Sequence, residues 1–372
     1  MRLSKIKLSG YKSYGSKYTE AIHLGDLNIL IGANGAGKSN FISFLEMIAY
    51  IASGGLDKFV AKNGFSGSLM HFGESGTEKI RGELEFTDDG KKDNYSFTLS
   101  ASVGGKLYFE RESATYQSGN GIVPYKREFG VSTAESGLIE FAESDITVGI
   151  ILKMLKSCRI FHFNDTSINA AMRSQAYLYD NSYLRADAGN IAAFLYRIRS
   201  EKKAYYDRII NVIREVFPRF DDFVLEPTSL NNSDNYVLLN WKENGSDVVF
   251  GPHMLSDGTI RFVALVTLLL QPENMLPGVI ILDEPEMGLH PFAINILADL
   301  VYQVSDKVQI IVATQSVELL NHFDCDDILI TEYDESLKSS LIRRLDKEKL
   351  RAWLEEYTIG ELWDKNILGG VP

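Results

Sequence analysis

The chain has 372 residues, 45% of them hydrophobic, so it can bury large cores and is not a disordered chain. Its length predicts two or three domains. It has no apolar run near the ~20 residues of a membrane-spanning helix and no secretory signal, and its net charge of −12 argues against a dedicated nucleic-acid binder. Cys158 and Cys325 lie far apart and lack metal-binding spacing, so we expect a protein of the reducing cytoplasm. From the missing apolar run we expect no membrane contact.

The first part of the chain predicts a strand, a glycine loop and a helix in direct succession. The strand "LNILIG" is apolar throughout, as in a strand buried on both faces. It enters "GANGAGKS" at residues 32–39, and "NFISFLEMIAYIA" follows with helical apolar spacing. We assign residues 1–63 to the N-terminal part of the core. Residues 64–145 alternate apolar and polar positions between glycine turns, which predicts an antiparallel β-rich lobe or insert.

Residues 146–222 are predicted to form a helical insert. A helix over 146–157 and a strand at 159–163 precede one long amphipathic helix over 187–217. The segment 185–219 holds eight Lys and Arg against four Asp and Glu. A solvated helix face is the first interpretation of this charge, and contact with nucleic acid or a protein partner is the alternative.

The C-terminal part, residues 223–372, alternates apolar strands with helices, which predicts a parallel sheet in an α/β domain. A helix is expected from 292 to 304, and a charged helix at 346–356 is expected to close the chain. The predicted fold class is α/β, with a mixed or parallel sheet core, an antiparallel β-rich lobe and a helical insert.

The glycine loop matches G-x-x-x-x-G-K-[ST] in full, the pattern of a phosphate-binding loop. Its glycines let backbone N–H groups curl around phosphates, Lys38 reaches the β- and γ-phosphates, and Ser39 ligates Mg²⁺. The following helix presents its positive end to the same anion. The sequence therefore predicts a nucleoside triphosphate site with Mg²⁺.

A second motif, "VIILDEPEMGLHP", carries an apolar strand to two acidic residues. Asp283 can hold Mg²⁺ through its water shell, and Glu284 is placed to polarise an attacking water. An apolar strand followed by Asp-Glu is a weak signal by itself, and a plain surface strand end is the alternative. The glycine loop upstream favours the catalytic interpretation. His290 is expected to pack or to contact a neighbouring subunit, with catalysis as the lesser alternative.

The stretch "LSDGT" at residues 255–259 also has the parts of an anion site. Ser256 offers a hydroxyl, Gly258 permits close approach, and a helix starting near Thr259 points free N–H groups outward. A simple helix cap by Ser256 or Asp257 is the alternative. Within one subunit a second phosphate-binding site has no evident use, because the glycine loop already surrounds the phosphates of the one nucleotide. We therefore expect two subunits head to tail, each corner closing over the γ-phosphate held by the other.

In this order, the glycine loop, "LSDGT", "LDEPEMGLHP" and "IIVATQS" resemble the motifs of ABC-type ATPases of the SMC/RecF branch. More narrowly, the chain resembles short AAA-type ATPases that carry "DEPExGLHP" and a tail like "GELWDKNILGG". Several of these occur in bacterial anti-phage defence operons beside a nuclease-like effector. The resemblance spans nearly the whole chain and is weakest in the β-rich insert. It implies a P-loop ABC-type ATPase head that uses ATP and Mg²⁺ and forms a homodimer around ATP.

The resemblance also implies roles for individual residues. Those expected to bind the nucleotide are Lys12, Ser13, Gly32, Asn34, Gly35, Gly37, Lys38, Ser39, Asn40 and, across the dimer, Ser256 and Gly258. Ser39 and Asp283 would hold the metal, Glu284 would be the catalytic base, and Lys38 and Gln315 would act beside it.

Two further segments take their roles from the resemblance. Gly288, Leu289 and His290 would lie in the loop that crosses the dimer interface. Asn164 or Asp165, in "FHFNDTS", would occupy the position of the glutamine loop, and the sequence leaves the choice open.

The chain departs from the family pattern at two places. Gln315 stands where many relatives have histidine, and it can donate a hydrogen bond but cannot carry a positive charge. We therefore expect slow hydrolysis, with ATP acting more as a dimer clamp than as fuel. Asp257 replaces the second residue of the familiar "SGG". A carboxylate near a γ-phosphate is repulsive, so we expect it to point away and to cap the helix.

Three functions follow as hypotheses. The leading one is an ATPase that dimerises around ATP and regulates a protein effector, such as a nuclease or toxin, in bacterial anti-phage defence. The second is a DNA-maintenance ATPase that clamps DNA, with the basic segment 185–219 in contact with it. The third is a non-hydrolysing scaffold that uses bound ATP to hold a toxin inactive.

Overall fold

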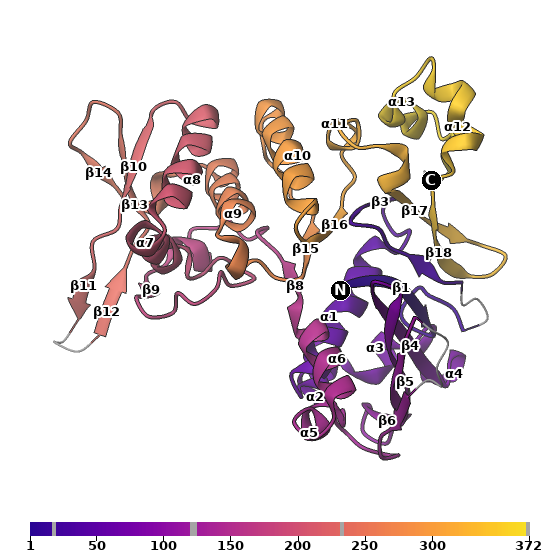
Figure 1. The fold of residues 1–372 in the computed structure, drawn as a ribbon. Coiled ribbons are helices and arrows are strands. Elements are labelled where there is room, and N and C mark those ends of the chain that lie inside the picture. The colour runs from indigo at the N-terminus through magenta and orange to yellow at the C-terminus, as the bar shows by residue number, and fades with distance from the viewer. Residues whose placement is uncertain (17–19, 120–124, 231–233, 370–372) are drawn as a thin grey trace.

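The computed structural model describes residues 1–16, 20–119, 125–230 and 234–369 (Figure 1). Gly370, which ends the tail motif, lies outside these ranges. Among the residues described, no helix combines the length and apolar character needed to cross a membrane.

A six-stranded sheet forms the centre of the molecule, in the order β18-β17-β3-β16-β15-β8. All neighbours are parallel except β18, which pairs antiparallel with β17. The strands are β3 (Leu27–Ile31), β8 (Cys158–Phe161), β15 (Val279–Asp283), β16 (Gln309–Ala313), β17 (Ile328–Asp334) and β18 (Ser339–Arg344). Every residue of β3 and β16 is buried, as expected for parallel strands covered on both faces.

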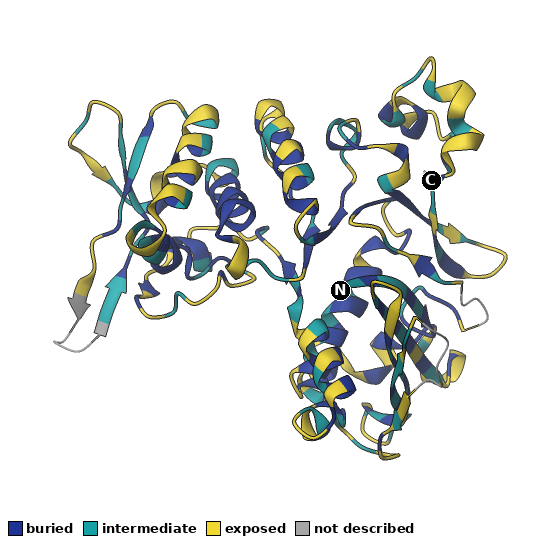
Figure 2. Cartoon of the chain, in the orientation of Figure 1, coloured by how far each residue is buried: buried dark blue, intermediate teal, exposed yellow. Residues whose placement is uncertain are grey.

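The central sheet separates two apolar cores, because successive side chains of each strand point to opposite faces. Ile29 and Ile31 join one core, whereas Leu30 joins the other. The first core contains α9 (Asp257–Leu270) and α10 (Pro291–Ser305), with α7 (Ile191–Glu201) and α8 (Lys203–Val216) packed against α9. The second contains α1 (Lys38–Ala52), α6 (Ile146–Ser157) and an antiparallel sheet. Figure 2 shows the buried strands between helices whose outer faces are exposed.

The antiparallel sheet has the order β2-β1-β4-β5-β6-β7. Its strands are β1 (Arg2–Ser9), β2 (Ile22–His23), β4 (Lys79–Asp88), β5 (Lys91–Ser102), β6 (Lys106–Gln117) and β7 (Tyr125–Glu128). β1 belongs here because its alternating pattern, with Ile6 and Leu8 buried, suits a sheet with one solvated face. Residues 64–76 are not β structure. They form the short helices α3 (Phe65–Leu69) and α4 (Gly73–Gly76), which start beside left-handed residues Gly64 and Phe72.

The predicted single helix over 187–217 is wrong. The structure has α7 (Ile191–Glu201) and α8 (Lys203–Val216), separated by Lys202 with φ −139° and ψ 51°. The break lets the two helices pack against each other and lets both contact α9, which one straight helix could not do. The structure also has two small antiparallel sheets, whose strands lie partly in the predicted insert and partly after it, in residues assigned to the C-terminal part. Their strands are β9 (Ala176–Tyr177), β10 (Phe220–Val224), β11 (Thr228–Leu230), β12 (Asp234–Val237), β13 (Asn240–Glu243) and β14 (Val249–Phe250).

The C-terminal end has one more helix than expected. The charged helix is α12 (Lys347–Leu354), and α13 (Ile359–Asp364) follows it. Thr358 and Glu361 form a capping box at the start of α13, and the Gly360 N–H donates to Asn321 Oδ1 over 2.7 Å. This contact places α13 against α11 (Val317–Leu320). The remaining described helices are α2 (Leu56–Lys62) and α5 (Leu138–Phe141), with four short 3₁₀ turns.

Candidate functional site

The glycine loop lies between the carboxyl end of β3 and the start of α1. Glycine is required at Gly32 because a Cβ there would lie 2.3 Å from the Thr331 carbonyl oxygen. Gly35 and Gly37 have φ of 82° and 120°, a region that glycine adopts without strain. No side chain caps α1. Its first N–H groups are therefore free to point at an anion in front of the loop.

Lys38 is nearly buried at the start of α1. Its Nζ donates to the carbonyl oxygens of Gly32 and of Ala33, the latter over 3.1 Å. Burial lowers the pKa of Lys38, and the nearby carboxylates of Glu284 and Asp283 oppose that shift. The ammonium thus lies between the loop backbone and the two acidic residues at the end of β15.

Hydrogen bonds fasten the Lys12–Ser13 stretch to α1 and to β18. The Ser13 hydroxyl accepts from Asn40 Nδ2 at 2.8 Å and from Ser340 Oγ at 2.7 Å. Lys12 Nζ donates to Ser43 Oγ over 2.7 Å. Ser340 was not predicted. Ser340 lies on β18, the edge strand that pairs with β17, and its N–H donates to the Ser13 carbonyl over 2.8 Å. The order of the motifs does not reveal this relationship.

Asp283, Glu284 and Gln315 meet at the carboxyl edge of the central sheet. Asp283 ends β15, and burial raises the pKa of its carboxyl. Glu284 has a left-handed backbone with φ 46°, held by its N–H donating to the Ala313 carbonyl over 2.8 Å. Gln315 Nε2 donates to Glu284 Oε1 over 2.6 Å. The two motifs meet because β15 and β16 are parallel neighbours.

His162 is the side chain that the structure places beside Asp283, with 4.0 Å between His162 Nδ1 and Asp283 Oδ2. β8 pairs in parallel with β15, and Phe161 lies opposite Leu282, so the next residues of both strands are neighbours. Neither alternative considered for this position has a hydrogen bond or ion pair to Asp283 within the described ranges. The Asn164 carbonyl accepts from Arg261, and the exposed Asp165 carboxylate accepts from the Ser167 N–H. The sequence signal for His162 was its place after a short apolar strand.

Glu286, in the loop after Glu284, has a buried carboxyl that sequence analysis did not single out. The Thr314 hydroxyl donates to Glu286 Oε1, while Oε2 has no hydrogen-bond partner. Burial raises the pKa of Glu286. Thr314 Oγ1 also accepts from the Ser316 N–H over 2.9 Å. The hydrogen bonds of Thr314 thus connect the two loops that carry Glu284 and Gln315.

Ser256 is the N-cap of α9, and its Oγ accepts from the Thr259 N–H over 3.1 Å. The expectation that Asp257 caps this helix is wrong. Its Oδ1 lies 2.9 Å from Nη2 of Arg173, a nearly buried arginine that also donates to the Leu255 carbonyl over 3.0 Å. The ion pair with Arg173 holds the Asp257 carboxylate away from the N–H groups at the start of α9, and Ser256 caps the helix instead. The hydroxyl of Ser256 remains on an exposed residue.

Gly258 and the loop after Glu284 are in contact within one chain. A Cβ at Gly258 would lie 2.3 Å from the Gly288 carbonyl oxygen, so only glycine allows this approach. Leu289 is half-buried. The exposed ring of His290 accepts from the Phe292 N–H over 3.2 Å and caps α10. His290 thus has a local structural contact that the sequence interpretation did not include.

The predicted site residues therefore form two groups. Lys12, Ser13, residues 32–40, Asp283, Glu284 and Gln315 lie around the glycine loop. Ser256 and Gly258 start α9, which packs into the core on the opposite face of the sheet from α1. Figure 1 shows α1 and α9 in different parts of the molecule. Within the described ranges, no hydrogen bond links Ser256 or Gly258 to the glycine loop.

Comparison with known families decides the classification. A family model described as "AAA domain, putative AbiEii toxin, Type IV TA system" matches residues 27–321, from the strand before the glycine loop to the end of α11. The chain belongs to this family. The matched residues include the glycine loop, the "LSDGT" stretch at 255–259, the Asp283–Glu284 motif and Gln315. The expected resemblance to ABC-type ATPases is confirmed.

Relatives and solved structures agree with this family. The energy-coupling factor transporter ATP-binding protein EcfA of Methanosphaera stadtmanae is 27% identical over 221 residues, 53% of this chain and 76% of that protein. The protein of the same name from Methanocaldococcus jannaschii is 29% identical over 169 residues, 41% of this chain and 59% of that protein. These relatives are ATP-binding proteins, in keeping with an ATP-binding ATPase.

Two solved Smc heads share the fold. One, bound to the C-winged helix domain of ScpA, has a TM-score of 0.59 at 18% identity and covers 95% of this chain and 100% of that chain. The other has an extended coiled coil, is bound to the C-terminal domain of ScpA and derives from Pyrococcus furiosus. It has a TM-score of 0.52 at 18% identity and covers 95% of this chain and 98% of that chain. The predicted fold class, an ABC-type ATPase head of mixed α/β architecture, is confirmed.

Proposed function

We propose that this protein hydrolyses ATP with Mg²⁺ at the edge where β3, β15 and β16 end, and that two copies close around the nucleotides. The supporting observation is the division of the motifs. Lys38, Glu284 and Gln315 lie around the glycine loop, whereas Ser256 caps a helix packed on the opposite face of the sheet. A second subunit would bring its own Ser256 to the first subunit's phosphate.

The residues present fit ATP and Mg²⁺. The N–H groups at the uncapped start of α1 and in the loop with positive-φ glycines can donate to phosphate oxygens, and Lys38 adds a positive charge. Ser39, exposed at the first turn of α1, and Asp283 would hold Mg²⁺, which neutralises phosphate charge when bound. Glu284 would accept a proton from the attacking water, and Gln315 holds that carboxylate in place.

The surface around the second corner supports contact with another copy of the chain. Met254, Met287 and Phe292, which flank Ser256 and the Gly288 loop in the sequence, expose 59%, 42% and 49% of their surface. The contact of Gly258 with the Gly288 carbonyl brings these two segments together, and exposed large apolar side chains are typical of interaction surfaces when they gather in one patch. We infer that this surface meets the partner copy, and that the ATP-bound dimer signals to a protein effector such as a nuclease or toxin in anti-phage defence.

The basic segment 185–219 does not favour the DNA-clamping alternative. Within the described structure, five of its eight basic residues form ion pairs: Arg185, Arg197, Lys203, Arg214 and Arg219. Arg199 and Arg208 donate to Leu225 O and Gln303 Oε1. Side chains already bonded within the chain are less available to phosphates, so this segment supports the solvated-face interpretation.

The test replaces Glu284 by glutamine. Loss of a general base costs about 10²- to 10⁴-fold in rate, so Glu284→Gln should slow turnover by that factor and accumulate a dimer with ATP, seen as doubled mass in light scattering. Glu335→Gln, an exposed turn residue, is the matched control and should behave as wild type. If Glu284→Gln changes neither turnover nor mass, the mechanism is wrong. ATP binding without any turnover in the wild type would select the scaffold hypothesis.

A further inference from the structure

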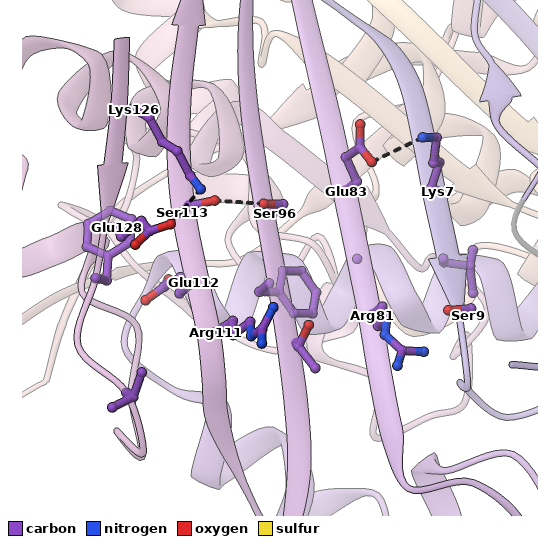
Figure 3. A pocket seen from close by; sticks show the side chains of 16 residues that line it. Lys7, Ser9, Arg81, Glu83, Ser96, Arg111, Glu112, Ser113, Lys126 and Glu128 are labelled. Atoms are coloured by element: carbon purple, nitrogen blue, oxygen red, sulfur yellow. Dashed lines mark hydrogen bonds and ion pairs between the residues drawn. The ribbon is translucent and has the colours of Figure 1, made fainter. Parts of the chain in front are cut away.

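A cavity of about 640 Å³ lies on the outer face of the antiparallel sheet, away from the glycine loop. Its lining residues come from five strands of that sheet, β1, β4, β5, β6 and β7. Figure 3 shows Arg81 on β4 and Arg111 on β6 with the strand β5 between them. The register places Thr98 of β5 opposite both arginines, so the three side chains form one row across the cavity.

Arg81 and Arg111 are exposed, and within the described ranges neither guanidinium forms a hydrogen bond or an ion pair. The other basic residues of the cavity are paired: Lys7 with Glu83 at 3.2 Å and Lys126 with Glu128 at 2.5 Å. Two strand spacings put the Cα atoms of the arginines about 10 Å apart, within joint reach of one small anion. The cavity therefore holds two arginines, one on each side of β5, that have no hydrogen bond or ion pair among the described residues, although Arg111 lies within electrostatic range of Glu110 and Glu128.

Hydroxyl groups line the space between and beside the arginines. Ser9 lies opposite Arg81 in the register, is 1% exposed, and its hydroxyl has no hydrogen-bond partner. The hydroxyls of Ser96 and Ser113 are 2.9 Å apart on the floor of the cavity. Buried hydroxyls normally have a partner, so the unpaired Ser9 hydroxyl is a second observation that indicates a ligand.

We propose that this cavity binds the phosphate group of a small phosphorylated molecule. Guanidinium groups match the oxygens of a phosphate with two parallel hydrogen bonds, and the hydroxyls can donate to the remaining oxygens. The volume lies within the range of small-molecule sites. Glu83 and Glu128 lie at the two ends of the neighbouring row, which runs through Ser96 and Ser113, so both carboxylates stand on one side of the arginine row. They would repel a continuous nucleic-acid backbone that crosses this row.

The proposed phosphate site lies only a few residues along the chain from the Lys12–Ser13 stretch beside the glycine loop. Ser9 ends β1, and the chain then passes through Gly10 and Tyr11 to Lys12 and Ser13, which hydrogen-bond to α1, the helix that follows the glycine loop. A ligand held against Ser9 would thus act on the stretch that supports the phosphate loop. The binding proposal itself does not depend on ATP hydrolysis.

The test uses pyrophosphate as the probe and the full chain with Lys38→Ala, which weakens phosphate binding at the glycine loop. Titration calorimetry should show one pyrophosphate bound per chain. Arg81→Gln and Arg111→Gln, each added to Lys38→Ala, should weaken this binding about tenfold, since each removes a charged pair of donors. Lys91→Gln, an exposed residue of the same sheet outside the cavity, is the matched control for lost charge and should leave the affinity unchanged.

Three results would overturn the proposal. The first is no pyrophosphate binding in the Lys38→Ala chain. The second is equal weakening by Lys91→Gln, which would mean only general attraction of anions. The third is single- or double-stranded DNA binding that depends on Arg81 and Arg111 and displaces pyrophosphate, which would make the cavity a polyanion groove. Thr98→Val keeps both charges and should weaken binding by a smaller factor, which excludes a pure charge effect.

Discussion

Gln315 donates its side-chain amide to the Glu284 carboxylate over 2.6 Å, where the family pattern often has histidine. The contact joins the loop after β16 to the loop after β15. An amide can orient the carboxylate but cannot place a positive charge beside it. The hydrogen bond explains how Gln315 can hold the carboxylate of the proposed base in position. Because the amide is neutral, it adds no positive charge of the kind that a protonated histidine would place there.

Gln315→His should increase the single-turnover rate of ATP hydrolysis by about tenfold, because a protonated imidazole adds positive charge where transition-state charge develops. The gain should be largest below the ordinary imidazole pKa of about 6.5 and fade above it. Gln315→Ala is the control for loss of the hydrogen bond and should slow the reaction. An unchanged rate in Gln315→His would remove the idea that the glutamine slows hydrolysis.

Ser256→Asp separates helix capping from phosphate contact. Aspartate caps helices as well as serine does, so the free energy of unfolding should change by less than about 0.5 kcal/mol. The added carboxylate would repel the partner's γ-phosphate, so ATP-dependent dimerisation and turnover should be lost. Thermal unfolding and light scattering with ATP measure the two effects. A variant that still dimerises with ATP would show that Ser256 acts as a cap alone.

His162→Ala should raise the Mg²⁺ concentration needed for half-maximal ATP turnover by about tenfold, the usual effect of removing a group beside a metal ligand. The reason is the 4.0 Å approach of its ring to Asp283. Stability should hardly change, because the side chain is 43% exposed. His322→Ala, in the turn after α11, provides the control. Equal Mg²⁺ dependence in both variants would place His162 outside the metal site.

Asp93→Asn should stabilise the protein at pH 8 but not at pH 4. Burial raises the pKa of Asp93 to about 6, above its ordinary value, and its Oδ1 has no hydrogen-bond partner. The folded state therefore binds more protons than the unfolded state between about pH 4 and 6. Stability falls as pH rises through that window and stays lower above it, by about 1–3 kcal/mol.

Chemical denaturation at the two pH values measures this difference for wild type and Asp93→Asn. Asp89→Asn, on the exposed turn before β5, is the control and should show no pH-dependent gain. Equal stability of wild type and Asp93→Asn at pH 8 would contradict the assignment of a buried, costly charge at Asp93.

The sequence predicted those parts of the fold that depend on consecutive residues, namely the buried strands and the glycine loop. β3 and β16 were recognisable because parallel strands buried on both faces are continuous apolar runs, and the glycine loop because its φ values require glycine. The break at Lys202 was not recognisable, since it carries no proline or glycine and results from the packing of α7 and α8. The placement of β1 in the antiparallel sheet was not recognisable either, because it results from pairing with β4, a strand about 80 residues further along the chain.

By itself, the sequence identified the glycine loop, the acidic strand end and the "LSDGT" stretch as candidate parts of a nucleotide site, because each motif's chemistry resides in consecutive residues. Only the tertiary structure decided which side chains meet. His162 lies beside Asp283, Thr314 hydrogen-bonds to Glu286, and Arg81 and Arg111 lie in one row on either side of Thr98, through strand register between segments far apart in the chain. The physical reason is that register and sheet order come from burying both faces of the central sheet at once, a condition on the whole chain.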